Sequence, residues 1–243
     1  MGFFDKKYCD ICGDKIGLLG NRKLEDGNMC KDCAKKLSPW FDDRRHSTVD
    51  DIKAQLRYRE ENEEVLRIFH ATRTFGKNSW HLYVDQSKKQ FVLARNLNNG
   101  ENHDVIPFAQ VTGCHLDINK DSEEIYRTNK NGEEESYNPP RYKYTYDYTV
   151  VINVNAPYFD ELRFELNDSS LEQSETRERR EIEEEGKQIV DYILKMAGHG
   201  NEEEAVEGSA GPEESGQSGT WICPACGAGN TGRFCEYCGT ARG

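Results

Sequence analysis

The chain has 243 residues, of which 35% are hydrophobic and 31% are charged, and its formal net charge is -12. This polar composition indicates exposed helix or linker in addition to packed domains. The negative charge argues against a phosphate-binding surface over the whole molecule, although it leaves room for a local basic patch. No segment approaches the ~20 apolar residues of a membrane span, and the start lacks a secretory signal and a myristoylation motif. We therefore expect a soluble, cytoplasmic protein.

Cysteine pairs occur near both ends of the chain. All but one of the 9 cysteines form C-x-x-C pairs, and Cys114 is alone. In a reducing compartment such pairs favour metal binding over disulfides, and four thiolates are a common ligand set of structural zinc. Iron is an alternative ion that the pattern leaves open. We predict two structural Zn²⁺ sites, with the ligands Cys9, Cys12, Cys30 and Cys33 in the first and Cys223, Cys226, Cys235 and Cys238 in the second.

The two cysteine clusters differ in their local sequence. In residues 1–46 a glycine follows the first pair, whereas the helix formers Ala34 to Leu37 follow the second. A turn at one side and a helix start at the other are typical of a treble-clef-like module. In residues 221–243 a glycine follows both pairs, which predicts a zinc ribbon. Complete four-cysteine shells leave no open position for water, so neither metal is expected to be catalytic.

Residues 47–74 are predicted to form an amphipathic helical connector, as one helix or two shorter ones. Ser47 is the predicted N-cap, and Val49, Ile52 and Leu56 lie on one face. We expect this face to pack on the neighbouring domain, because the glutamates between positions 60 and 64 would repel anionic lipid.

Residues 75–197 change to an alternating pattern with short loops. Alternation of apolar and polar residues predicts an antiparallel meander that is covered on one side only. A helix with an apolar stripe then follows, and Gly198 is its predicted C-cap. The stripe consists of Ile182, Ile189, Val190, Ile193, Leu194 and Ala197. The seven strand candidates are SWHLYVD, QFVLAR, DVIPF, QVTGCHLDI, EEIYRT, RYKYTYDYTVVINVN and ELRFELN.

Two features of this region are candidate sites. Tyr142, Tyr144, Tyr146 and Tyr148 alternate along one strand, on the same face as Val150, Ile152 and Val154. The pattern can be a binding stripe, but we favour a core or rim role for these tyrosines. Cys114 and His115 are adjacent in a strand and point to opposite faces, so they cannot share a metal, and Cys114 is expected to be a buried thiol.

Residues 198–220 are rich in Glu, Gly and Ser and lack Lys and Arg. This composition predicts a flexible acidic linker that tethers the terminal ribbon.

Three segments resemble known families. The stretch CDICGDKIGLLGNRKLEDGNMCKDCAKKLSPWF closely resembles a bacterial zinc-binding family of unknown function, with all four cysteines present. Residues 75–197, with the stretch WHLYVDQSKKQFVLAR and the later DVIPFAQVTGCHLD, resemble the pleckstrin-homology (PH) superfold, in its bacterial PH-like and GRAM-like branch. The tail resembles the short zinc-ribbon family. The resemblances imply an α+β multidomain protein with a PH-like β-barrel or sheet and a closing helix, and they bring no catalytic residue.

The sequence favours a non-enzymatic adaptor or scaffold that acts through protein partners. It contains no phosphate-binding loop, no nucleophile elbow and no ligand set with an open metal position. The alternative is a nucleic-acid-associated zinc-ribbon regulator, which the few bases of the tail, Arg233 and Arg242, support weakly. Membrane association is not favoured, because the loops of the middle domain offer only scattered bases such as Lys88 and Lys89.

Overall fold

The computed structural model describes residues 7–199, 221–222 and 229–230. The chain divides into two compact units, Met1–Asn201 and Glu202–Gly243. In the second unit the short strands β11 (Trp221–Ile222) and β12 (Gly229–Asn230) pair antiparallel. Most of the predicted linker and all four C-terminal cysteines lie outside the described residues, so these predictions stay untested.

The first unit begins with a small module built on two strands. Strands β1 (Asn21–Lys23) and β2 (Asn28–Cys30) pair antiparallel and are followed by the short helix α1 (Lys31–Ala34) and the 3-10 helix η1 (Asp43–His46). Its core is small and includes two of the cysteines. The buried apolar residues of this core are Cys9, Ile16, Leu24, Met29, Cys33, Leu37 and Ile52.

Helix α2 (Val49–Arg67) follows as one continuous helix. The prediction of Ser47 as its N-cap is wrong by one residue, because Thr48 forms a capping box with Asp51. The Thr48 amide donates to Asp51 Oδ2 at 2.9 Å, and the Asp51 amide donates to Thr48 Oγ1 at 3.2 Å. Ser47 Oγ instead donates to the carbonyl of Asp43 at 2.9 Å, so its hydroxyl is bonded to η1 and does not cap α2.

The next four strands form an antiparallel sheet in chain order. They are β3 (Arg73–Phe75), β4 (His81–Asp85), β5 (Gln90–Ala94) and β6 (Val105–Pro107), and β3 was not predicted. All five residues of β5 are buried. One face of this sheet meets the main core. Leu66, in the last turn of α2, and Phe69, just after the helix, pack against the other face. The expectation of one-sided coverage is therefore wrong for this sheet.

The 3-10 helix η2 (Phe108–Gln110) leads into a second antiparallel sheet, which contains two very long strands. Strands β7 (Val111–Thr128) and β8 (Glu134–Val154) pair with each other, and β9 (Glu161–Glu165) and β10 (Leu171–Glu172) pair with β8. Two strand candidates thus merge into β7, and β8 begins inside the predicted loop NKNGEEESYNPP, at Glu134. Residues 137–140 are left without a partner where the register shifts between Ile125 and Tyr126. Such a bulge accommodates prolines inside a strand.

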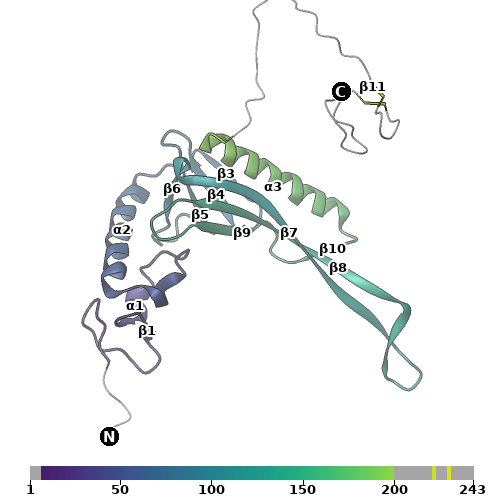
Figure 1. Ribbon diagram of the computed structural model, residues 1–243, viewed down its shortest axis with the longest axis horizontal. Coiled ribbons are helices and arrows are strands. Elements are labelled where there is room, and N and C mark those ends of the chain that lie inside the picture. The colour runs from purple at the N-terminus through teal and green to yellow at the C-terminus, as the bar shows by residue number, and fades with distance from the viewer. Residues whose placement is uncertain (1–6, 200–220, 223–228, 231–243) are drawn as a thin grey trace, which may run out of the picture. The chain divides into compact units, whose positions relative to one another are not determined.

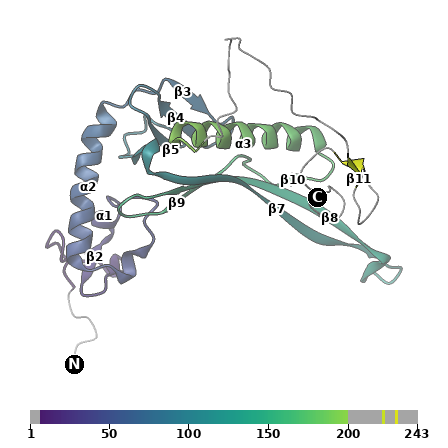
Figure 2. The same ribbon diagram turned by 45° about the horizontal axis from the view of Figure 1, so that its top comes forward.

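Helix α3 (Thr176–Ala197) covers the core between the two sheets. Ile182, Ile189 and Ile193 of its predicted stripe are buried against residues of both sheets. Gly198 ends the helix with φ 81°, in the left-handed region that glycine adopts easily, as predicted. Figures 1 and 2 show α3 lying along the sheets while the β7–β8 hairpin continues beyond it.

The described part of the chain is therefore a mixed α/β structure with antiparallel sheets. The strands of residues 7–199 form open sheets and do not close into a barrel, which corrects the barrel form of our prediction. Within the same residues, no helix combines the length and apolarity required to cross a membrane.

Candidate metal centre

The four N-terminal cysteines converge on one point. The sulfur atoms of Cys9, Cys12, Cys30 and Cys33 all lie within 4.8 Å of one another. The Cys9 and Cys33 sulfurs are 3.9 Å apart, and those of Cys12 and Cys30 are 3.8 Å apart. Four thiolates arranged tetrahedrally about zinc at about 2.3 Å place neighbouring sulfurs about 3.8 Å apart. The spacing fits one four-coordinate metal ion and is far longer than the ~2.05 Å of a disulfide.

Local backbone structure brings each cysteine pair to this point. At the first pair, the amide of Gly13 donates to the Cys9 carbonyl at 2.8 Å, and Gly13 has φ 79°. A side chain is strained at that φ, so glycine suits the turn. At the second pair, Cys30 is the N-cap of α1 and its sulfur accepts from the Cys33 amide at 3.4 Å. The predicted glycine turn and helix start are both present.

Electrostatics make the cluster receptive to a cation. Burial opposes ionisation of the Cys9 thiol, but hydrogen bonds from the backbone near Cys12, Cys30 and Ile11 outweigh it and lower the pKa to about 7. The amide of Cys30 donates directly to the Cys9 sulfur at 3.2 Å. Burial and the neighbouring sulfurs raise the pKa of the Cys33 thiol. A bound cation would relieve this crowding, because it favours the thiolate form of every ligand.

A buried polar network joins this module to the first sheet. The guanidinium of Arg59 in α2 forms an ion pair with Asp104, and their side chains are 6% and 0% exposed. Ser38 Oγ donates to the same carboxylate at 2.9 Å. Asn62, one turn along α2, donates to the His103 carbonyl and accepts from the Val105 amide, at 2.7 and 2.9 Å. These contacts connect the metal module, α2 and the segment that enters β6.

Sequence reasoning missed this network. Arg59 and Asp104 are ordinary charged residues in polar stretches, and they are 45 positions apart in the chain. The available signal was weak. Arg59 and Ile52 are seven positions apart, so a helical projection places both near the same face of α2.

The other candidate residues lie away from the cysteine cluster. Along β8 the tyrosines pass from solvent to core, since Tyr142 is 46% exposed and Tyr148 is 1% exposed. Tyr148 thus has the predicted core role, whereas Tyr142 does not. Cys114 packs against the main core, and burial raises the pKa of its thiol to about 12. The thiol was predicted to be buried, and it is partly buried in the structure.

The comparisons with known proteins agree with the position of the site. Residues 7–55 match the family described as "Domain of unknown function (DUF4428)". The matched range contains all four clustered cysteines and extends into α2, beyond the segment in which the sequence resemblance was recognised. The chain matches no curated protein and no solved structure.

Proposed function

We propose that the protein is a non-enzymatic zinc-binding adaptor that acts through protein partners. In this proposal the N-terminal cluster holds structural Zn²⁺ in a treble-clef-like module. The predicted C-terminal ribbon holds a second Zn²⁺. Support for a structural role comes from the full set of four sulfurs, which leaves a tetrahedral ion no position for water or substrate. The two antiparallel sheets and the covering helix α3 support, at the level of architecture, a PH-like middle domain.

The observation that carries the adaptor proposal is the far part of the β7–β8 hairpin. We call residues 121–145 the arm. At its base, Asp121 pairs with Thr145, which is the last residue of β8 that also pairs with β10. Beyond Thr145, toward the tip of the hairpin, β7 is the only strand partner of β8 among residues 7–199. Figures 1 and 2 show this ribbon extending away from α3 and the other strands of its unit. An isolated two-stranded ribbon is only marginally stable in water, so a binding partner would stabilise it.

The arm carries aromatic side chains on one face. Tyr142 pairs with Glu124, and Tyr126 Oη donates to the Glu124 carboxylate at 3.2 Å. Tyr144 is two residues from Tyr142, and their ring centroids are 6.4 Å apart. Tyr126 is 52% exposed and Tyr142 is 46% exposed. Tyrosines are enriched at protein interfaces, where each side chain buries a large area at a low cost in side-chain entropy.

The test is to remove the outer part of the arm and to keep its base, where Lys143 pairs with Glu172 and the Tyr144 carbonyl accepts from the Gln173 amide at 3.0 Å. Glu123 and Lys143 face each other, so replacing residues 124–142 by Asn-Gly closes the hairpin with a favoured two-residue turn. Proteins captured by the intact chain from nuclease-treated extract of the source cells would be purified and titrated against both forms. We expect at least one direct partner to bind the shortened chain at least about 100-fold more weakly than the intact chain. A loss of this size is typical when a few hot-spot residues are removed.

A point-variant pair sharpens this test. Tyr126→Ser combined with Tyr142→Ser should weaken binding of the same partner. Ile125→Ser, on the opposite face of the arm, should reduce that binding less. Both variants should keep the metal content and the unfolding temperature of the parent chain. Equal binding by the intact and shortened chains would refute the arm as the interaction surface. If the nuclease-treated extract yields no protein partner and untreated extract yields only nucleic acid, the adaptor proposal itself fails.

A further inference from the structure

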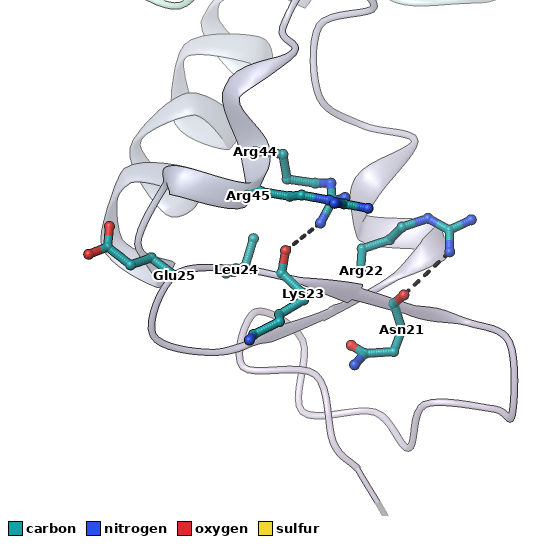
Figure 3. A pocket seen from close by; sticks show the side chains of 7 residues that line it. All are labelled: Asn21, Arg22, Lys23, Leu24, Glu25, Arg44 and Arg45. Carbon is teal, nitrogen blue, oxygen red and sulfur yellow. Dashed lines mark hydrogen bonds between the residues drawn. The ribbon is translucent and has the colours of Figure 1, made fainter.

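A pocket of about 790 Å³ on the N-terminal module is lined by four cationic residues. Arg22 and Lys23 come from β1, and Arg44 and Arg45 come from η1. Figure 3 shows the guanidinium ends of the three arginines on one side of the pocket, while the Lys23 ammonium and the Glu25 carboxylate point elsewhere. We call Arg22, Arg44 and Arg45 the arginine cluster. Arg22 and Arg45 are 23 positions apart in sequence, and the fold brings the three arginines together.

The charge of the arginine cluster is uncompensated within residues 7–199. In that part of the chain no carboxylate lies within ion-pair distance, 4.0 Å, of any of the three guanidinium groups. Arg44 is held by donating to the Lys23 carbonyl at 2.5 Å, and Arg22 donates weakly to the carbonyls of Leu19 and Asn21, both at 3.4 Å. Partial burial, together with the charges of Arg45 and Arg22, lowers the pKa of the Arg44 guanidinium. Guanidinium groups that repel one another are suited to bind an oxyanion such as phosphate, which would neutralise them.

A second, independent feature lies beside the arginine cluster. The amide of Gly20 donates to the Gly17 carbonyl at 3.0 Å, which closes a tight turn. Leu18 and Leu19 occupy the two central positions of this turn and are 84% and 89% exposed. They are the most exposed large hydrophobic side chains of residues 7–199. The contact between Arg22 and the Leu19 carbonyl connects the leucine turn directly to the arginine cluster.

We propose that this face docks on an anionic membrane surface, with the arginine cluster binding phosphate groups of lipid headgroups and Leu18 and Leu19 inserting into the interface. Interfacial binding increases with buried apolar area and with basic residues near anionic lipid. A soluble phosphate compound would use the arginine cluster, but it would leave the two leucines without a role. The proposal is independent of the adaptor function and of the arm.

The proposal reverses our expectation from the sequence that membrane association is not favoured. That expectation rested on the net charge of -12 and on the scattered lysines of the middle domain. Net charge acts over distance and is screened within about 8 Å at physiological salt. A local cluster therefore dominates once the surfaces touch. The sequence separates Arg22 from Arg44 and Arg45, so their convergence becomes visible only in the folded module.

The test uses the full-length, metal-loaded chain in co-sedimentation with vesicles at about 0.15 M salt. Vesicles of phosphatidylcholine alone are compared with vesicles that also contain phosphatidylserine. We expect binding only to the mixed vesicles. Arg44→Gln combined with Arg45→Gln, and separately Leu18→Ser combined with Leu19→Ser, should each reduce the partition coefficient on the order of tenfold. The matched control is Lys53→Gln combined with Arg57→Gln, which removes the same charge from exposed positions of α2 and should bind like the parent.

Each other outcome overturns the proposal in a defined way. Absence of binding to phosphatidylserine vesicles refutes it. Full binding by the leucine variant refutes insertion, and equal losses in the arginine and control variants refute a specific site. Saturable binding of inorganic phosphate, without vesicle binding, would assign the pocket to a soluble anion. Retention on DNA that depends on Arg44 and Arg45 but not on the leucines would assign it to nucleic acid. Metal content and thermal unfolding of each variant exclude misfolding as the cause.

Discussion

Arg59 and Asp104 form an ion pair that is almost completely withdrawn from solvent and that connects helix α2 to the segment entering β6. Asp104 also accepts from Ser38, which belongs to the metal module. Burial raises the pKa of the Asp104 carboxyl, while Arg59 and Ser38 act in the opposite direction. A buried carboxylate of this kind depends on its partners, because a lone ion inside a protein is costly.

Removing one member of this pair should therefore be more harmful than removing both. We expect Arg59→Leu to reduce the free energy of unfolding by about 3–5 kcal/mol, since Asp104 would be left unpaired. Arg59→Leu combined with Asp104→Leu should recover most of that loss. Urea unfolding of the full chain measures both, with the exposed Arg57→Leu as a control expected within about 0.5 kcal/mol of the parent. A single variant as stable as the double variant would show that the pair is not coupled.

Metal content provides a second prediction. We expect the Cys30→Ser chain to bind one equivalent of zinc less than the parent, because three sulfurs no longer complete the N-terminal site. The parent is expected to hold two equivalents, one of them in the predicted C-terminal ribbon. Elemental analysis of protein purified without chelator measures both values and distinguishes zinc from iron. Cys114 lies outside the cluster, so Cys114→Ser should leave the metal content unchanged. A loss of metal in this variant would contradict the assignment.

Two glycines with positive φ should respond differently to substitution. Gly76 has φ 102°, and an added Cβ would lie 2.2 Å from the backbone oxygen of Trp80. The strained φ and the contact with the Trp80 oxygen can be relieved only if the backbone moves. We therefore expect Gly76→Ala to destabilise the chain by at least about 2–3 kcal/mol. Gly100 has φ 79° and open space around it, and Gly100→Ala should cost only about 1 kcal/mol. Thermal unfolding of both variants tests this order, which an equal shift would contradict.

Asp85 should contribute to acid sensitivity. Its buried carboxylate accepts from Ser87 Oγ at 2.6 Å, from the Lys88 amide at 3.1 Å and from the His70 amide at 3.2 Å. Although burial opposes ionisation, these hydrogen bonds lower the pKa of Asp85 below its usual value. Its stabilising contribution is thus present above about pH 4, the usual carboxyl value, and is lost as the pH falls toward the folded-state pKa.

The comparison that isolates this effect is Asp85→Asn against the parent. We expect the variant to be less stable at pH 7 and the two stabilities to converge in acid, as the parent carboxylate becomes protonated. Unfolding free energies measured as a function of pH provide the test. Asp191→Asn, at an exposed position of α3, should show no such convergence. A constant difference between Asp85→Asn and the parent across the acid range would contradict the assignment.

The sequence predicted the features that depend on local spacing. The cysteine pairs, the glycine turn at Gly13, the stripe of α3 and its cap at Gly198 each follow from residues within a few positions of one another. The features that were missed depend on long-range contacts. Burial of both faces of β5 requires Leu66 and Phe69 at and just after the end of α2. Packing of this segment on the neighbouring domain was expected, but the sequence does not indicate which face of the sheet it covers.

The length of β7 and β8 was hidden for a different physical reason. Polar and turn-forming residues such as Asn119, Lys120 and Asp121 normally end a strand. Here they remain in β7 because they are exposed, so no polar side chain has to be buried. Pro139 and Pro140 likewise suggest a loop, but the bulge removes the need for their missing amides. The convergence of the arginine cluster was hidden in the same way as the contact between Arg59 and Asp104, because tertiary structure alone creates it.

The passage of β8 from solvent into the core has a consequence for local opening. Val150 and Ile152 are fully buried, whereas Tyr142 on the same strand is 46% exposed. Free energies of local opening follow such differences in packing. Amide hydrogen exchange should accordingly slow steadily along β8 from the tip of the hairpin toward Val154. Apart from residues 137–140, every residue of β8 is paired with β7. The outer part of the hairpin can then open and close repeatedly while the sheet at its base stays folded.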